Sequence, residues 1–522
     1  MGDVEVILVA LLVSVAVLSA AARAINVPYP IVMVIGGVLL GLVPGLPDVQ
    51  LNPDLVLLVF LPPLLYSAAF FSNLRDIRTD LRAISLLSVG LVIATVVVVA
   101  VVAHEFIDDL SWPVCFVLGS IVGPTDPVAA AAIMRRLGVP RRLVSVVEGE
   151  SLLNDATALV AYAIALAAVG GAAFSLLDAG WDFLWKASGG VAIGLAVGYV
   201  IAEIRRRLDD PLIENTIGLL TAYAAYVPAD QLHVSAVLAA VTSGCYVGWR
   251  APVIAGAETR LQGFGMWELL QFLLNALLFV LIGLQLPAIV DALGDFSAGT
   301  LLGYGALVSV AVIVTRLVWQ FTIVYVIRAL DRRESQRPRR SPWQHRFVIG
   351  WSGMRGAVSL AAALALTTDF PQRDLIVFLT FAVIFTTLVL QGLTLPWVIS
   401  VLGVHDDGRE DREELKGRLM AAKAALARID ELEGEEWTRD DTIERMRGMY
   451  RYRKRRFAAR AGLAEDDDGI EDRSAAYQAL VREVLEAQRR EILRLRNSGD
   501  ISNDVMHRLE RELDLEDSRL EI

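Results

Sequence analysis

Two acidic side chains, Asp126 and Asp155, lie in short polar strings inside apolar segments of the chain. Asp126 belongs to "GPTDPVAA", and Asp155 belongs to "EGESLLNDATALV", where Ser151, Asn154 and Asp155 share one face of a helix. A charge at the centre of a bilayer costs roughly a few kcal/mol, so it normally faces a partner or a water-filled cavity. Oxygen donors from Asp126, Asp155 and Ser151, with a freed backbone carbonyl, suit Na⁺ or Li⁺, and the same carboxylates can bind protons. The strings therefore predict a site at which a small cation and a proton compete.

The prolines around Asp126 indicate a broken helix. Pro124 and Pro127 disrupt its backbone hydrogen bonds, which frees carbonyls and half-helix ends to face an ion. A second interruption is expected in "WSGMRGAVS", where two glycines flank Arg355. Paired interrupted helices at matching places in two halves of a chain point to the midplane site of a transporter. Taken singly, each feature also has a structural explanation, since proline often only kinks a membrane helix and a lone aspartate can be a hydrogen-bond partner.

The remaining charges inside apolar segments are candidates for buried ion pairs. We expect Glu150 and Arg355 to neutralise each other, because an unpaired buried charge is costly. Arg316 has two open possibilities: it pairs with Glu268, or it extends towards the membrane interface. Glu148 is expected nearer the end of its helix than the proposed site.

The composition predicts an all-α polytopic membrane protein with a helical tail. Hydrophobic residues make up 55% of the 522, charged residues 20%, and the mean hydropathy is +0.52. Apolar runs end near residue 402, which divides the chain into a transmembrane domain (1–402) and a charged tail (403–522), taken as cytoplasmic and regulatory. A net charge of −11 argues against binding nucleic acid. Cys115 and Cys245 lie in apolar spans, which argues against a disulfide or a metal site, and no cofactor is expected.

The apolar runs predict about 13 transmembrane helices of roughly 20 residues each. The predicted spans are 4–22, 30–46, 54–72, 82–106, 112–134, 143–169, 184–204, 212–228, 232–249, 264–290, 299–328, 346–367 and 374–401. Alternate loops are rich in arginine, from Arg75 to the string "RALDRRESQRPRRSPWQHR", whereas those between them have almost no basic residue. The positive-inside rule then puts the N-terminus outside and the tail in the cytoplasm of a multi-pass cell-membrane protein. The odd count suggests two inverted repeats of about six helices around a linker helix, with a broken helix in each.

Four strings distributed over the apolar region carry a family resemblance: "FLPPLLYSAAF", "GPTDPVAA", "EGESLLNDATALV" and "GMRGAVSLAAAL". Here the chain resembles the monovalent cation/proton antiporters of the CPA1 group, which include bacterial NhaP-type sodium/proton antiporters. The resemblance implies the sodium/proton antiporter fold, with crossed broken helices, a mobile core domain that works like an elevator, and a homodimer. It implies no cofactor, since Na⁺, Li⁺ and H⁺ are the transported substrates.

The resemblance also implies roles for individual residues. It makes Asp155 the essential ion- and proton-carrying carboxylate and Asp126 a second acidic group. The whole set implied for Na⁺ is Asp155, Asp126, Ser151 and the carbonyl of Thr125, supported by Asn154 and Ser67, with Glu150–Arg355 as a structural ion pair. Ser67 stands where many relatives have an acidic residue, which bears on the choice between Na⁺ and K⁺.

The expected function is electroneutral exchange of Na⁺ or Li⁺ for H⁺ by alternating access, for pH and sodium homeostasis, rather than an enzymatic activity. The resemblance implies an Asp-Asp pair at this place in electrogenic relatives, whereas this chain has Asn154 followed by Asp155. One carboxylate would then exchange one proton for one monovalent cation. A K⁺/H⁺ antiporter of the same fold is the first alternative. An intramembrane aspartyl protease is a weaker one, because its Tyr-Asp and Gly-x-Gly-Asp strings occur in no predicted span.

Overall fold

The computed structural model describes residues 2–43, 56–108, 110–171, 176–294, 296–330, 342–461, 463 and 469–520, and their regular structure is helical. They form two compact units, Met1–Asp406 and Asp407–Ile522. This division falls close to the boundary after residue 402 at which the apolar runs end.

The first unit contains the apolar helices. Seven helical stretches of the described residues are long and apolar enough to cross a membrane, and shorter or interrupted helices lie between them. In chain order the elements are α1 (Gly2–Ala24), α2 (Tyr29–Gly41), η1 (Val56–Phe60), α4 (Leu61–Phe70), α5 (Leu74–Ser85), η2 (Leu86–Leu91), α6 (Val92–Phe106), α7 (Trp112–Val122), α8 (Val128–Arg136), α9 (Arg141–Val169), α10 (Leu176–Arg205), α11 (Pro211–Gln231), α12 (Ala236–Ile254), α13 (Ala257–Leu284), α14 (Leu286–Asp291), α15 (Ala298–Leu330), α16 (Trp343–Trp351), α17 (Ala357–Leu364), α18 (Arg373–Thr386), η4 (Thr387–Gln391) and α19 (Gly392–Val401). Each predicted span overlaps one or more of these elements; the end of 30–46 and the start of 54–72 lie outside the described residues.

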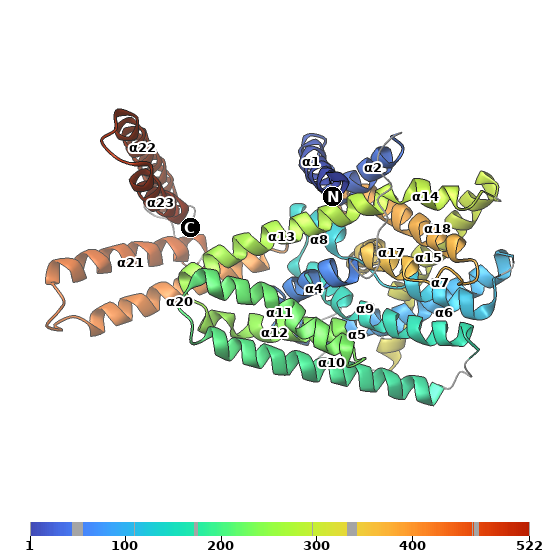
Figure 1. Ribbon diagram of the computed structural model, residues 1–522. Coiled ribbons are helices and arrows are strands. Elements are labelled where there is room, and N and C mark those ends of the chain that lie inside the picture. Colours follow the sequence, from blue (N-terminus) through green and yellow to red (C-terminus); the bar gives the residue numbers. More distant parts are fainter. Residues whose placement is uncertain are drawn as a thin grey trace. The chain divides into compact units, whose positions relative to one another are not determined.

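The helices of this unit pack as two groups. In the first group α2 packs along α13, α12 packs against α4, and α10, α11 and α12 lie side by side (Figure 1). In the second group α6 packs on α7, α7 on α9, and α15 on both α6 and α18. Small residues allow the closest approach in the first group: a Cβ on Gly37 would lie 2.3 Å from the carbonyl oxygen of Val280. Contacts between the groups are sparser than contacts within them.

Two of the helices in the second group are interrupted, as the sequence predicts. The first breaks between α7 and α8 at the two prolines, and the second breaks between α16 and α17 at the glycines around Arg355. The breaks touch, because the backbone N–H of Asp126 donates to the carbonyl of Met354 at 2.8 Å. The prediction of crossed broken helices is therefore confirmed.

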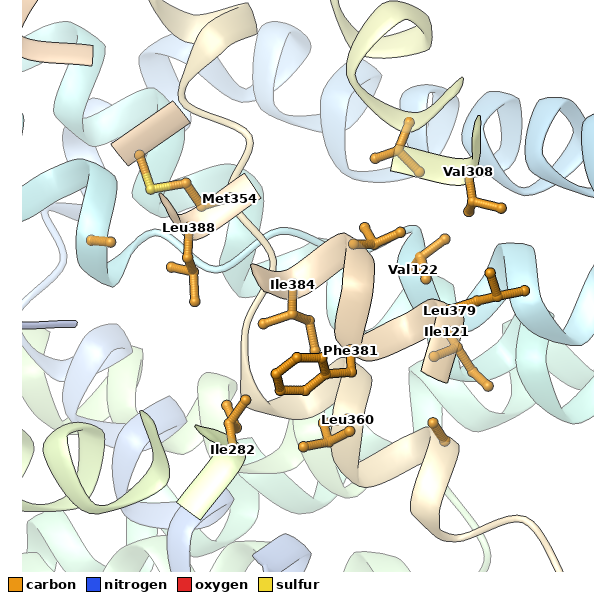
Figure 2. Packing of buried hydrophobic residues seen from close by; sticks show 14 of the residues in the cluster. Ile121, Val122, Ile282, Val308, Met354, Leu360, Leu379, Phe381, Ile384 and Leu388 are labelled. Carbon is orange, nitrogen blue, oxygen red and sulfur yellow. The ribbon is translucent and has the colours of Figure 1, made fainter. Parts of the chain in front are cut away.

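An apolar core holds the breaks in place. Figure 2 shows Ile121 and Val122, at the end of α7, with Met354 and Leu360 from the second interrupted helix. Leu379, Phe381 and Ile384 of α18 belong to the same buried cluster and are labelled in the same view. Met354 is fully buried, so its side chain anchors the non-helical segment whose carbonyl meets Asp126. Inside a membrane such packing stabilises the fold through van der Waals contacts, because lipid tails are as apolar as these side chains.

The second unit is helical, as predicted for the tail. It contains α20 (Arg409–Glu431), α21 (Asp440–Arg460), α22 (Ile470–Ser498) and α23 (Asn503–Leu520). Leu419 and Ala422 of α20 pack against Phe457 of α21, and Arg447 of α21 pairs with Asp430 and Glu433 at 2.9 and 2.7 Å. These two carboxylates raise the pKa of the Arg447 guanidinium above its ordinary value. An ion pair and a small apolar contact thus join α20 to α21.

Candidate ion-binding site

A cavity of about 810 Å³ lies between the two helix groups. Its walls come from α2, η1, α4 and α13 of the first group and from α8, α9, α17 and the breaks of the second. The predicted ion-binding residues Thr125, Asp126, Ser151 and Asp155 all line this cavity. The structure therefore brings together, at one cavity, residues from two strings that are separate in the sequence, "GPTDPVAA" and "EGESLLNDATALV".

The helix α9 presents a polar face to this cavity. Glu148, Ser151 and Asp155 follow one another at positions i, i+3 and i+7, which lie on one side of a helix. Asp155 is only 6% exposed, and no hydrogen bond to its carboxylate comes from any residue that the structure describes. Its oxygens are therefore available to a cation or a proton that enters the cavity.

Asp126 lies at the N-terminal ends of two half-helices. Its Oδ1 accepts a hydrogen bond from the backbone N–H of Val128, at the start of α8, at 2.9 Å. Its Oδ2 approaches the backbone of Gly356, the residue before α17, so closely that a Cβ there would lie 2.0 Å away. Helix N-termini carry partial positive charge, so they stabilise the ionised form of a carboxylate placed between them.

Asn154 contacts Thr125 instead of the cavity. It is fully buried, and its Nδ2 donates to Oγ1 of Thr125 at 2.9 Å and to the carbonyl of Thr125 at 3.3 Å. Ser151, Asn154 and Asp155 therefore do not share one functional face as the spacing suggested. Asn154 holds the non-helical segment of the first break, whereas Ser151 and Asp155 face the cavity.

The predicted pairing of Glu150 with Arg355 is wrong. Glu150 pairs with Arg316 of α15: Nη1 and Nη2 of Arg316 donate to Oε1 and Oε2 of Glu150 at 2.5 and 2.8 Å. Both side chains are buried, at 0% and 1% exposure, and Thr125 adds a hydrogen bond to Oε1 at 3.2 Å. This two-pronged geometry is one that a planar guanidinium provides. It also excludes the two alternatives considered for Arg316, a pair with Glu268 and extension to the interface.

Arg355 binds backbone carbonyls. Its Nε donates to the carbonyl of Val122 at 3.1 Å, at the end of α7, and its Nη1 donates to the carbonyl of Gly353, just after α16. The C-terminal ends of helices carry partial negative charge and unpaired carbonyls, so a buried cation is stabilised there. Arg355 thus occupies the two C-terminal half-helix ends, while Asp126 occupies the two N-terminal ends. Because the guanidinium of Arg355 binds these backbone carbonyls, it is not the partner of Glu150.

Ser67 is not among the described residues that line the cavity, and its role as a site-supporting residue stays a prediction. It is fully buried in α4, and its hydroxyl donates to the carbonyl of Leu64 at 3.0 Å. Its neighbours Leu64 and Ala68 do line the cavity. Leu61, Leu65 and Ala68, which are three or four positions apart, mark the cavity face of α4, and Ser67 lies outside this face.

The α13 wall carries polar residues that the sequence reading did not place at the site. Glu268, Gln271 and Asn275 line the cavity at positions i, i+3 and i+7, and this spacing inside an apolar helix was the signal available. Arg135, whose side chain is 67% exposed, also lines the cavity and forms an ion pair with Glu148. Polar side chains therefore line the cavity on α13 as well as on α9.

Comparisons with known proteins agree with this geometry. Residues 7–401 match the family model described as "Sodium/hydrogen exchanger, transmembrane". The chain is 35% identical to an uncharacterized Na⁺/H⁺ exchanger of Mycobacterium tuberculosis, over 99% of this chain and 96% of that one. It is 32% identical to the Na⁺/H⁺ antiporter ApNhaP of Aphanothece halophytica, over 77% and 75% of the two chains.

A solved structure shows the same fold. The sodium proton antiporter MjNhaP1 of Methanocaldococcus jannaschii superposes with a TM-score of 0.58 at 17% identity, over 77% of this chain and 100% of that one. At this identity the likeness concerns the fold alone. With the family model, it confirms the resemblance drawn from the four sequence strings: this chain belongs to the transmembrane sodium/hydrogen exchanger family, as an NhaP-type member of the CPA1 group.

Proposed function

We propose that the protein exchanges Na⁺ or Li⁺ for H⁺ across the cell membrane, one for one, and so serves pH and sodium homeostasis. The observation that carries this proposal is the Asp155 carboxylate, which lines a cavity between two helix groups and accepts no hydrogen bond from the described residues. A buried carboxylate without a protein partner must bind either a proton or a cation to be neutral. Competition between these two ligands couples their transport.

The residues around Asp155 supply the remaining ligands. The hydroxyl of Ser151 and the carboxylate of Asp126 line the same cavity and offer the hard oxygen donors that alkali cations prefer. Thr125 lines it as well, and Asn154 fixes its backbone and hydroxyl. When a proton displaces the cation, Asp155 becomes neutral, while Asp126 keeps the stabilisation that the two half-helix N-termini provide.

The stoichiometry follows from the residue before Asp155. Asn154 carries no charge, so α9 offers a single exchangeable carboxylate at this level of the helix. One proton released for one monovalent cation bound moves no net charge in a full cycle. The proposed exchange is therefore electroneutral and insensitive to the membrane potential.

Alternating access is supported by the separation of the two helix groups and by where the cavity opens. Arg135, whose side chain is 67% exposed, and Ser72 line the cavity beside the arginine-rich loops, and no described lining residue comes from the arginine-poor loops. With arginine-rich loops in the cytoplasm, the cavity faces inwards and the tail is cytoplasmic. Movement of the second group, with both breaks, past the first would expose Asp155 to the other side; we propose that a homodimer of first groups anchors this movement.

K⁺/H⁺ exchange is the second candidate, and the curated relatives keep it open. One relative, 32% identical over 71% of this chain, is a sodium, potassium, lithium and rubidium/H⁺ antiporter of Bacillus pumilus. Na⁺ is the first choice because other relatives, such as ApNhaP, are named Na⁺/H⁺ antiporters. The aspartyl protease alternative has no support from the family comparison.

The test is reconstitution of the purified protein in liposomes that contain a pH-sensitive dye. An imposed proton gradient should dissipate on addition of Na⁺ or Li⁺, and more weakly or not at all with K⁺. A diffusion potential set with valinomycin should leave the initial rate unchanged. Exchange with K⁺ at the rate found with Na⁺ would favour the second candidate, and a systematic dependence on voltage would refute the single-carboxylate stoichiometry.

A further inference from the structure

A second cavity of about 990 Å³ lies beside the ion cavity, and its chemistry differs. Four arginines line it, and no aspartate or glutamate is among its described lining residues; the arginines are Arg75, Arg78, Arg205 and Arg260. Aromatic rings make up much of the remaining wall, including Tyr66, Trp249 and Trp267. A cavity that combines cationic groups with apolar walls suits a ligand that has an anionic and an apolar part.

Arg205 gives this cavity a buried, incompletely paired cation. The residue is 4% exposed and belongs to the last turn of α10, and its Nε has no hydrogen-bond partner among the described residues. Its charged partner, Glu214, is no closer than 3.8 Å, and that carboxylate also accepts a hydrogen bond from Thr259. A buried N–H group without a partner is destabilising, so an acceptor inside the cavity would stabilise the protein.

The walls of the cavity show where such a ligand would come from. Trp249 lines the cavity and is 63% exposed, and Val253, one turn further along α12, is 80% exposed. On a membrane helix, apolar side chains this exposed are accessible to lipid, and tryptophan is enriched at the membrane–water interface. Arg75 and Arg78 lie in the first turns of α5 and are exposed. The cavity is thus open to the membrane along an apolar edge and to water along a basic edge.

We propose that this second cavity, formed by α4, α5, α10, α11, α12 and α13, binds an anionic phospholipid from the leaflet that meets the arginine-rich loops. The phosphate accepts hydrogen bonds from Arg205 and from the rim arginines Arg75 and Arg78, and an acyl chain lies along Trp249 and Trp267. Basic pockets between membrane helices recognise lipid headgroups through the same charge complementarity. Free phosphate would leave the apolar walls unoccupied, which is why we assign a lipid.

The two cavities share a wall. Phe71, Ser72 and Phe264 line both of them, and the rings of Phe71 and Phe264 lie 5.4 Å apart between centroids. A lipid in the basic cavity would therefore contact residues that also form the wall of the ion cavity. If the proposed transport function holds, the lipid changes the apparent affinity for the cation; the lipid binding itself does not depend on that function.

Trp267 provides a direct test, because it is only 4% exposed and bulk lipid does not reach it. The full-length protein is reconstituted either with acyl-brominated phosphatidylglycerol in unbrominated phosphatidylcholine, or with the bromines on the phosphatidylcholine instead. Bromine quenches tryptophan fluorescence at short range. The difference in fluorescence between the wild type and the Trp267→Phe variant gives the emission of Trp267. The brominated anionic lipid should quench this emission, and an equal fraction of brominated phosphatidylcholine should not.

Variants separate this site from general attraction to charge. The double variant Arg75→Gln/Arg78→Gln should lose the selective quenching, and Arg205→Gln should lose it as well if that variant folds. The matched control is Arg206→Gln/Arg207→Gln, which removes the same charge from arginines that pair with Glu203 outside the cavity. Equal quenching by both lipids in the wild type, or loss of selectivity in the control, would overturn the proposal.

Two further experiments identify the ligand and its effect on transport. Thermal stability of the detergent-solubilised protein should rise with phosphatidylglycerol and not with inorganic phosphate or glycerol phosphate; an equal rise with phosphate alone would overturn the lipid assignment. In transport assays, phosphatidylglycerol should change the half-saturating Na⁺ concentration of the wild type and not that of Arg75→Gln/Arg78→Gln. Selective quenching without any transport would contradict the proposed function and leave the lipid site standing.

Discussion

The Glu150–Arg316 pair makes a quantitative prediction about stability. Arg316 donates two hydrogen bonds to Glu150 and two more to the carbonyl of Ile349, so it joins α15 to α9 and to α16, next to the second break. Both side chains are buried, so removal of one partner leaves an uncompensated charge, at a cost of about 3–5 kcal/mol. We expect Glu150→Gln and Arg316→Met each to lower the free energy of unfolding by that amount, and the double variant to lose less than the sum.

The assay is a double-mutant cycle on the purified protein, unfolded by titration of dodecyl maltoside micelles with SDS. The coupling between Glu150 and Arg316 should be about 1–3 kcal/mol, as expected for directly paired side chains. The matched control is the cycle of Glu150→Gln with Arg355→Met, which also removes a buried arginine, one that binds the carbonyls of Val122 and Gly353. A coupling of Glu150 to Arg355 as large as its coupling to Arg316 would refute the assignment of partners.

Two further predictions concern the breaks. Asp126→Asn should raise the half-saturating Na⁺ concentration in liposome assays more than it lowers the maximal rate, because Asp126 lines the cavity without being the proposed proton carrier; loss of turnover at saturating Na⁺ would contradict this. Gly356→Ala should abolish transport, because the added Cβ would lie 2.0 Å from Oδ2 of Asp126. The control is Gly303→Ala on α15, which should transport normally because no atom lies within 4 Å of the added Cβ. Equal activity of the two variants would show that the close approach of Asp126 to Gly356 is not required.

The breaks and the residues at the cavity could be predicted because their physical causes are local in the sequence. Proline cannot complete helical hydrogen bonds, and carboxylates are rare in apolar spans, so "GPTDP" and "ESLLND" indicate both the interruption and the charges. That the two strings meet at one cavity depended on the family resemblance and on the paired interruptions. The structure places Thr125, Asp126, Ser151 and Asp155 on its walls.

The partner of Glu150 could not be predicted, because two buried arginines were available from distant parts of the chain. Glu150 and Arg316 are separated by 166 positions, and helix spacing says which face a side chain occupies without saying which helix packs there. The sequence does contain a useful signal: helix ends at two breaks present unpaired carbonyls, and Arg355 lies inside the second break. Because Arg355 binds these carbonyls, Arg316 is the buried arginine that remains to pair with Glu150. The position of Ser67 could not be predicted for a similar reason, since the sequence does not say which side of α4 faces the cavity.

The central claim is that Asp155 carries both the cation and the proton. The most direct measurement is ²²Na⁺ uptake driven by a proton gradient in liposomes that contain the wild type or the Asp155→Asn variant. The control is Glu268→Gln, which removes a carboxylate from the α13 wall of the same cavity. We predict that Asp155→Asn inserts and folds like the wild type and takes up no Na⁺ above empty liposomes, while Glu268→Gln retains exchange. Exchange by the purified Asp155→Asn variant at near the wild-type rate would contradict the account.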